Sequence, residues 1–98
     1  MAQVRITDWC KSQKIPRLPT AMLPGFLKKL ELLASDPFYG KPLRRDLARY
    51  RSVRLGRYRI VYRYQAETDT VWIVTVGIRK AGSRQDVYRE LGRLLGGS

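Results

Sequence analysis

The amino-acid sequence predicts a small α+β domain with about four antiparallel strands, two N-terminal helices and a C-terminal helix. Three stretches support this prediction. Leucines and a phenylalanine recur at helical spacing over residues 23–34, strand-forming residues alternate over 50–64, and an apolar run covers 71–78. Helix patterns and strand patterns that occupy separate parts of a chain are typical of the α+β class.

Length and composition indicate a single domain spanning residues 1–98. The chain has 98 residues and 44% hydrophobic residues, enough for a folded core. Lys and Arg number 20 against 8 Asp and Glu, so the net charge is +12. This excess favours an anionic partner such as nucleic acid or an acidic protein. A membrane surface is disfavoured, because the charge lies on strands rather than along one amphipathic helix.

Two residue types limit the chemistry and the compartment. The sequence contains no histidine, which excludes a histidine-based ribonuclease, a Ser-His-Asp hydrolase and a His-ligated zinc site. Cys10 is the single cysteine, so no intrachain disulfide can form and a reducing, cytoplasmic setting fits. We expect neither a signal peptide nor a membrane span.

The spacing of apolar residues and the candidate helix caps predict the elements of the N-terminal part. Residues 4–7 predict a short first strand, and Asp8 is the expected N-cap of a helix over 9–13. A second, amphipathic helix is expected over 23–34, with Pro24 close to its start. Pro37 follows its end.

Residues 50–64 predict a hairpin with two chemically different faces. Gly56-Arg57 suits a two-residue turn, which places Leu55 opposite Tyr58 and Arg54 opposite Arg59. The expected core face carries Val53, Leu55, Tyr58, Ile60 and Tyr62, and the expected basic surface carries Tyr50, Ser52, Arg54, Arg59, Val61 and Arg63. Two arginines directly opposite each other repel. Either an anion lies between them or both extend into water.

The remaining elements are a strand and a helix. Residues 71–78 are apolar on both faces, which predicts a strand inside the sheet. The sequence Ser83-Arg84-Gln85-Asp86 resembles a capping box, so a last helix is expected from about Arg84 to Leu95.

Three motifs in this order resemble the RelE/ParE superfamily of type II toxins from toxin–antitoxin systems. They are Gly40-Lys41-Pro42-Leu43 with Asp46-Leu47, the hairpin segment from Arg54 to Tyr62, and Val76-Gly77-Ile78-Arg79-Lys80 with Asp86-Val87-Tyr88. The resemblance implies a RelE-like fold with an antiparallel sheet and helices packed on one face. It also implies a cognate acidic antitoxin, with the ribosome and mRNA as further partners.

The resemblance also implies which residues act. Arg59 matches the family's phosphate-stabilising arginine, Arg79 the arginine that ends the following strand, and Tyr88 the tyrosine near the C-terminus. Arg54 lies on the same strand face as the family's basic residues, although Tyr50 and Ser52 stand where the nuclease branch has lysines. The interval from Arg79 to Tyr88 is longer than in that branch.

The implied activity is a metal-independent endoribonuclease without a cofactor, an mRNA interferase that inhibits translation. An RNA 2′-hydroxyl would attack the adjacent phosphodiester, with three arginines stabilising the transition state. Tyr88 is the candidate acid or base, and Lys80 is second. Further RNA or phosphate contacts are expected from Arg51, Arg57, Arg63, Lys80 and Arg84. The alternatives are a ParE-like DNA gyrase inhibitor and an inactive member that only binds antitoxin or RNA.

Overall fold

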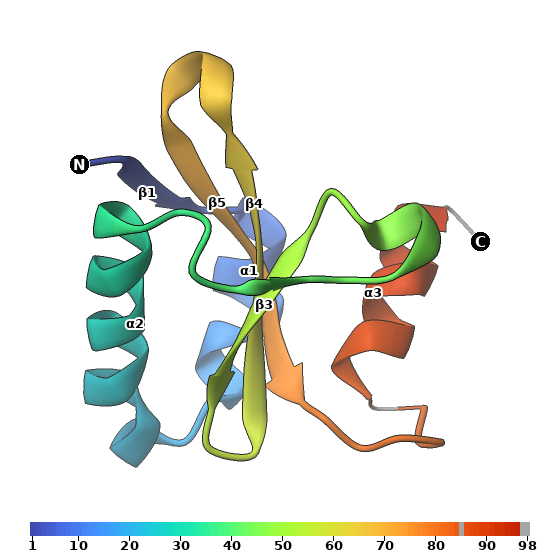
Figure 1. The fold of residues 1–98 in the computed structure, drawn as a ribbon. Helices are drawn as coiled ribbons and strands as arrows, with labels where there is room; N and C mark the ends of the chain where they lie inside the picture. Colours follow the sequence, from blue (N-terminus) through green and yellow to red (C-terminus); the bar gives the residue numbers. More distant parts are fainter. Residues whose placement is uncertain (85, 97–98) are drawn as a thin grey trace.

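The computed structural model describes residues 1–84 and 86–96, and its centre is a twisted five-stranded sheet (Figure 1). The strands are β1 Gln3–Ile6, β2 Lys41–Pro42, β3 Arg51–Leu55, β4 Tyr58–Gln65 and β5 Thr70–Ile78, in the order β1-β5-β4-β3-β2. The α-helices are α1 Asp8–Gln13, α2 Leu23–Ser35 and α3 Val87–Gly96. Within the described ranges, no helix is long and apolar enough to cross a membrane.

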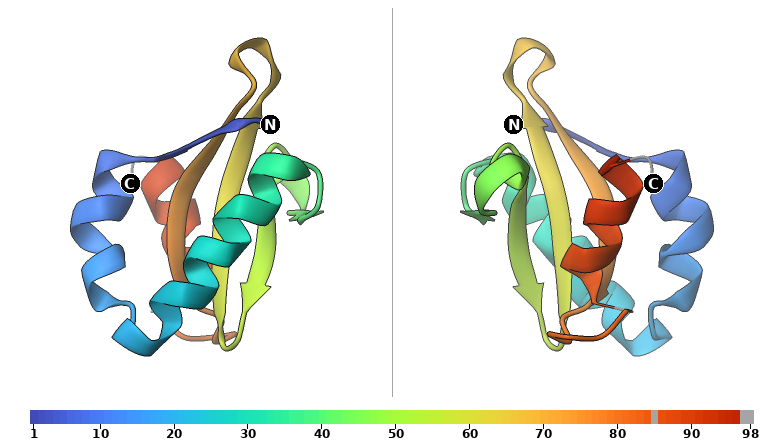
Figure 2. Two further views of the ribbon diagram at one scale, coloured as in Figure 1. Left: turned by 90° about the vertical axis from the view of Figure 1, so that its left-hand side faces the viewer. Right: turned by 90° about the vertical axis from the view of Figure 1, so that its right-hand side faces the viewer.

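The α+β prediction is correct, with two differences in the arrangement. The sheet has five strands rather than about four, because Lys41 and Pro42 add a short edge strand, and β1 pairs with β5 in parallel. Helices also cover both faces of the sheet rather than one. Figure 1 places α2 and α3 on opposite sides of the strands, and the two views in Figure 2 agree.

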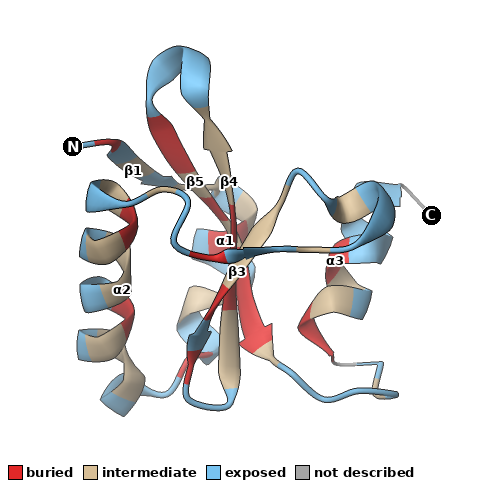
Figure 3. Cartoon of the chain, viewed as in Figure 1, coloured by how far each residue is buried: buried red, intermediate tan, exposed pale blue. Residues whose placement is uncertain are grey.

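A second core explains why helices lie on both sides. The larger core packs Cys10, Phe26 and Leu33 against one face of the sheet. On the other face, Val61 packs with Val87 and Leu91 of α3. The prediction that Val61 belongs to the basic surface is therefore wrong, since Val61 is fully buried in this second core. Figure 3 shows buried positions along the central strands and in α2 and α3.

The hairpin register is confirmed. Leu55 pairs with Tyr58 and Arg54 with Arg59. Gly56 in the connecting turn has a φ of 59°, a conformation that glycine adopts without strain. The turn therefore fixes which hairpin side chains share a face.

Two predicted helix starts shift by a few residues. The N-cap of α1 is Thr7 rather than Asp8, because the Thr7 side chain accepts a hydrogen bond from the Cys10 N–H. Helix α3 begins at Val87 rather than near Arg84. Asp86 precedes it and accepts hydrogen bonds from backbone N–H groups of its first turn. Gln85 of the predicted capping box lies outside the described residues.

The Tyr62 side chain holds the turn between α2 and β2 by two hydrogen bonds. The Tyr62 hydroxyl donates to the Pro37 carbonyl at 2.8 Å and accepts from the Gly40 N–H at 2.8 Å. A Cβ at Gly40 would lie 2.7 Å from the Tyr62 ring and 2.8 Å from the Ser52 carbonyl oxygen, so only glycine fits. These contacts hold residues 37–40 in one position beside β3.

Thr75 of β5 gives a stability prediction. Its side chain is fully buried, and Oγ1 has no hydrogen-bond partner among the described residues. A buried hydroxyl without a partner is unfavourable by about 1–3 kcal/mol. We expect Thr75→Val to raise the free energy of unfolding by about 1 kcal/mol, which raises Tm by about 4–8 °C.

Thr70 on the same strand provides the matched control. It is also buried, but its Oγ1 donates to the Thr68 carbonyl at 3.1 Å. Thr70→Val should therefore lower the Tm while Thr75→Val raises it. Thermal unfolding followed by circular dichroism measures both, and a lower Tm for Thr75→Val would contradict the prediction.

Candidate active site

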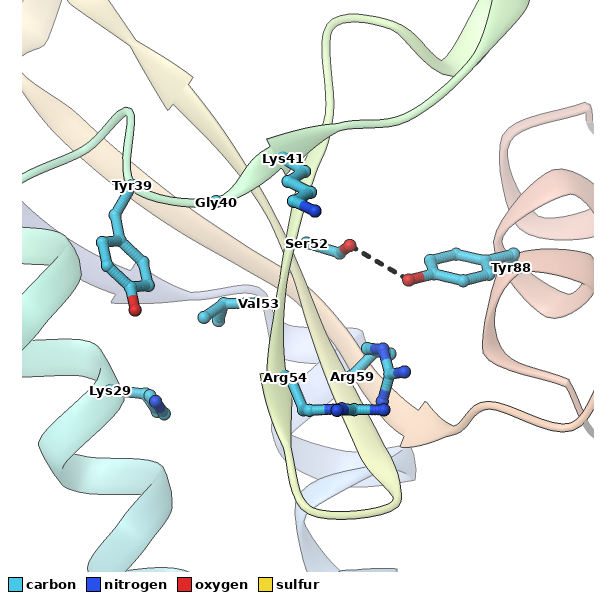
Figure 4. Close-up of a pocket in the computed structure, with 9 residues that line it drawn as sticks. All are labelled: Lys29, Tyr39, Gly40, Lys41, Ser52, Val53, Arg54, Arg59 and Tyr88. Atoms are coloured by element: carbon cyan, nitrogen blue, oxygen red, sulfur yellow. Dashed lines mark hydrogen bonds between the residues drawn. The ribbon is translucent and has the colours of Figure 1, made fainter.

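An open hollow of about 470 Å³ lies where the turn after α2, the hairpin and α3 meet. It is lined by Lys29, Tyr39, Gly40, Lys41, Ser52, Val53, Arg54, Arg59 and Tyr88. Figure 4 shows Tyr39 and Tyr88 on opposite sides of the hollow, with the two arginines between and below them. Three of the four predicted catalytic residues, Arg54, Arg59 and Tyr88, thus line one hollow.

Arg54 and Arg59 form an uncompensated positive pair. They are directly opposite each other on β3 and β4, and both side chains line the hollow (Figure 4). The Arg59 Nη1 donates to the Tyr58 carbonyl at 3.1 Å. Among the described residues, neither arginine lies within ion-pair distance of a carboxylate. The pair can therefore bind an anion without first breaking an ion pair.

Tyr88 reaches the hollow from the first turn of α3. Its hydroxyl lies 3.0 Å from Ser52 Oγ, and either oxygen can be the donor. This contact directs the phenol toward β3 and the arginine pair. A tyrosine hydroxyl so placed can exchange a proton with a bound group.

Arg79 lies behind the Tyr88 ring rather than in the hollow itself. Its guanidinium carbon lies 4.9 Å from the centre of that ring. Arg79 lines an adjoining hollow of about 520 Å³, of which Ser52 and Tyr88 also form part. The structure thus links Arg79 to the other three predicted catalytic residues through Tyr88.

Asp86 holds both Arg79 and Tyr88. Its Oδ1 accepts from Arg79 Nη1 at 2.6 Å and from the Lys80 N–H at 2.7 Å. Its Oδ2 accepts from the N–H groups of Tyr88 at 3.2 Å and Arg89 at 3.3 Å. One buried carboxylate thus connects the residues that follow β5 to the first turn of α3, and it holds two residues of the site, Arg79 and Tyr88. The predicted capping box and the family motif both contain Asp86, but neither assigned it a role in the site.

These contacts also set the ionisation of Asp86. Burial raises the pKa of its carboxyl, but hydrogen bonds from Arg79, Lys80 and Arg89, with the charge of Arg79, outweigh burial. The net pKa of Asp86 lies below its usual value. The carboxylate is therefore ionised when it holds Arg79.

The predicted phosphate contact Arg51 is engaged elsewhere. Its Nη1 donates to the Gly40 carbonyl at 2.7 Å and to the Phe38 carbonyl at 3.2 Å. Its guanidinium carbon also lies 5.1 Å from the centre of the Phe38 ring. Arg51 precedes Ser52 on β3 and so points to the other face of the sheet. The structure gives it a part in holding the turn.

The other four predicted contacts lie outside the residues that line the hollow. Arg57 is exposed in the hairpin turn, and Arg63 lies further along β4. Lys80 and Arg84 are exposed in the connection to α3. They can extend a basic surface around the hollow, but the structure does not bring them to its centre.

Two lysines that sequence reasoning did not assign to the site do line the hollow. Lys41 belongs to β2 and pairs with Ser52, and Lys29 comes from α2. They supply positive charge although the strand face itself carries Tyr50 and Ser52. The motif Gly40-Lys41-Pro42 contained a signal for Lys41, whereas Lys29 could be found only from the packing of α2.

Cys10 takes no part in this site. It is fully buried in the larger core. Burial raises the pKa of its thiol to about 11, against a smaller opposing effect of Lys14. Since only the thiolate is a strong nucleophile, Cys10 is chemically inert at neutral pH.

The sequence of this chain matches a known protein family. A family model described as the ParE toxin of the type II toxin–antitoxin system parDE matches residues 4–81. Toxin RelG of Mycobacterium tuberculosis is 48% identical over 58 residues, which are 58% of this chain and 61% of that protein. The chain thus spans less than two thirds of that relative.

Solved structures give a longer match. The chain resembles one in the M. tuberculosis toxin–antitoxin complex RelBE2 with a TM-score of 0.72 and 36% identity, over 80% of this chain and 98% of that one. A chain of the intact Escherichia coli RelBE complex matches with a TM-score of 0.69 and 18% identity, over 82% and 99%. The second likeness concerns the fold alone.

Proposed function

Because the chain belongs to the RelE/ParE family of toxins from type II toxin–antitoxin systems, we propose that it is a ribosome-dependent mRNA endonuclease. In this proposal an RNA 2′-hydroxyl attacks the adjacent phosphodiester. The products are a 2′,3′-cyclic phosphate and a 5′-hydroxyl, and cleavage stops translation. A cognate antitoxin neutralises the protein.

The observation that carries the proposal is the set of groups around one open hollow. Arg54 and Arg59 occupy directly opposite positions of the hairpin, and the Tyr88 hydroxyl reaches the same hollow from α3. Arginine binds phosphate oxygens with two parallel donors and stays charged at every physiological pH. A scissile phosphate on the arginine pair would also relieve their mutual repulsion.

Each residue then has a defined part in the reaction. Negative charge grows on the nonbridging oxygens in the transition state, and Arg54 and Arg59 donate to those oxygens. Tyr88 exchanges a proton with the 2′-hydroxyl or with the leaving 5′-oxygen. The phenol is oriented by Ser52, and the Arg79 guanidinium lies over its ring.

Dependence on the ribosome follows from the openness of the site. The hollow is open, and four of its nine lining residues are lysine or arginine, which suit a phosphate backbone more than a single base. Free RNA would therefore bind in many poses, few of which align the 2′-hydroxyl with the phosphodiester. A ribosome that holds the codon fixed would supply that alignment.

An acidic antitoxin fits the charge of the protein. The net charge is +12, and related chains were solved in the toxin–antitoxin complexes RelBE2 and RelBE. A partner of opposite charge would associate rapidly and cover the arginine surface.

Purified ribosomes programmed with mRNA test the proposal. The protein is added, and the 5′ ends of the RNA are mapped by primer extension. We expect new cuts within the codon in the ribosomal A site and slower cleavage of naked RNA. DNA breaks that depend on gyrase, without RNA cuts, would instead support the ParE-like alternative. The absence of both activities would support an inactive, binding-only protein.

A further inference from the structure

Tyr39 has an aromatic side chain that lies on the surface and does not belong to either hydrophobic core. It is 51% exposed, and its ring lines the hollow opposite Tyr88 (Figure 4). Its hydroxyl has no hydrogen-bond partner among the described residues. The ring of the neighbouring Phe38, by contrast, already has partners within the protein. It contacts the Tyr64 ring edge-on, and the Arg51 guanidinium lies over its face.

The backbone that carries Tyr39 is rigidly held. Tyr62 binds the carbonyl before this segment and the N–H after it, at Pro37 and Gly40. The Tyr39 N–H donates to the Asp36 carbonyl at 3.1 Å. A ring on a fixed backbone loses little conformational freedom when a ligand binds, which favours a binding role.

The open edge of β3 connects Tyr39 with the arginines. Strand β2 pairs only with Arg51 and Ser52, so β3 has no partner from β2 beyond Ser52. The hollow passes over this edge, from Lys29 and Tyr39 on one side to Arg59 and Tyr88 on the other. A ligand on the arginine pair can therefore extend to Tyr39.

The charges around the ring favour a nucleotide over an apolar peptide. Lys29 and Lys41 line the hollow with Tyr39, and among the described residues neither is in an ion pair. An aromatic face beside free cations suits a chain that alternates bases with phosphates. This combination is how proteins bind single-stranded nucleic acid without reading a duplex.

We propose that Tyr39 is a stacking platform for an unpaired nucleobase of single-stranded RNA, with Lys29 and Lys41 holding the phosphates between that base and the arginine pair. The inference deepens the proposed function, since it assigns a second nucleotide position to the same hollow. It predicts that affinity for RNA depends on a base as well as on backbone charge.

Fluorescence anisotropy tests this directly with two probes. One is a labelled single-stranded RNA of 12 nucleotides with 2′-O-methyl riboses, which cannot be cleaved through a 2′-hydroxyl. The other is the same backbone without bases. We expect Tyr39→Ala to weaken binding of the RNA about ten-fold or more, and to leave binding of the abasic backbone unchanged. Tyr39→Phe, which keeps the ring, should bind both probes like the wild type.

Leu27→Ala is the matched control, because Leu27 is an exposed apolar residue of α2 that does not line the hollow. Equal RNA affinity of Tyr39→Ala and the wild type would overturn the proposal. An equal loss of affinity for both probes would also overturn it. If Tyr39→Ala bound RNA normally and lost affinity only for the antitoxin, the ring would be a protein contact and the proposal would again be wrong.

Cleavage on programmed ribosomes separates this inference from the proposed function. If the wild type binds RNA through Tyr39 but does not cut, the nuclease proposal fails and the stacking site stands. If the wild type cuts and Tyr39→Ala cuts with the same KM, the stacking site fails and the nuclease proposal stands.

Discussion

Replacing Arg59 with alanine is expected to lower the rate of A-site mRNA cleavage by about 10²–10³-fold. Arg59 donates to the charge that develops in the proposed transition state, and loss of one preorganised donor of this kind has effects of that size. The folded state should not suffer, because the substitution removes the repulsion between Arg59 and Arg54 across the hairpin. We therefore expect activity to fall while Tm stays equal or rises.

Two further variants sharpen the Arg59 experiment. Arg59→Lys keeps the charge without the two-pronged donor, and should recover only part of the lost rate. Arg57→Ala removes an exposed arginine from the hairpin turn, outside the hollow, and should cleave within a few-fold of the wild type. If Arg57→Ala and Arg59→Ala lost equal activity, general basic charge would account for the effect and the assigned role of Arg59 would be wrong.

Asp86→Ala should reduce both activity and stability. The substitution removes the side-chain cap of α3 and frees the Arg79 guanidinium. Loss of a cap and of buried hydrogen bonds lowers the free energy of unfolding by about 1–3 kcal/mol. Cleavage should fall by about ten-fold or more, since small displacements of catalytic groups have large effects on rate.

Glu90→Gln is the control for Asp86→Ala. Glu90 lies on α3, and its Oε1 forms an ion pair with Lys14 Nζ at 2.6 Å. Among the described residues, its side chain makes no hydrogen bond or ion pair with Arg79 or Tyr88. This variant should lose stability without a comparable loss of the cleavage rate, measured at a temperature where both proteins are folded. Equal losses of rate in the two variants would mean that Asp86 acts only by holding α3 in place.

The lowered pKa of Asp86 also predicts a pH dependence of stability. An unfolded aspartate titrates at about pH 4, and the folded pKa lies below that. The stabilisation by Asp86 is therefore fully present above about pH 4, and is lost as pH falls through the folded pKa. Between pH 2 and 5, the Tm of Asp86→Asn should depend less on pH than that of the wild type.

The hairpin shows what local sequence can specify. A glycine turn and alternating side chains were enough to predict that Arg54 faces Arg59, because pairing register follows from turn length and the two-residue period of a strand. The third member of the hollow, Tyr88, came from the family resemblance. The longer interval between Arg79 and Tyr88 still allows their contact, because Asp86 binds both ends of it.

Long-range packing was beyond the sequence patterns. Val61 alternates with Arg59 and Arg63 and so was expected on the surface, but α3 covers it with Val87 and Leu91. The face of the sheet against which a C-terminal helix packs depends on tertiary contacts and cannot be read from the apolar stripe of the helix alone. Lys29 and Tyr39 lie far from the hairpin in sequence, and only the packing of α2 and the turn after it brings them to the hollow.

The central claim is that an RNA 2′-hydroxyl attacks a phosphodiester held by Arg54 and Arg59. The most direct measurement uses ribosomes programmed with two mRNAs that differ in one atom, a ribose or a 2′-deoxyribose on the 5′ side of the A-site cut. We predict cleavage of the ribose mRNA, with a 2′,3′-cyclic phosphate and a 5′-hydroxyl at the new ends, and no cleavage at that position in the deoxyribose mRNA. Equal cleavage of both mRNAs, or a 5′-phosphate at the new end, would contradict the account.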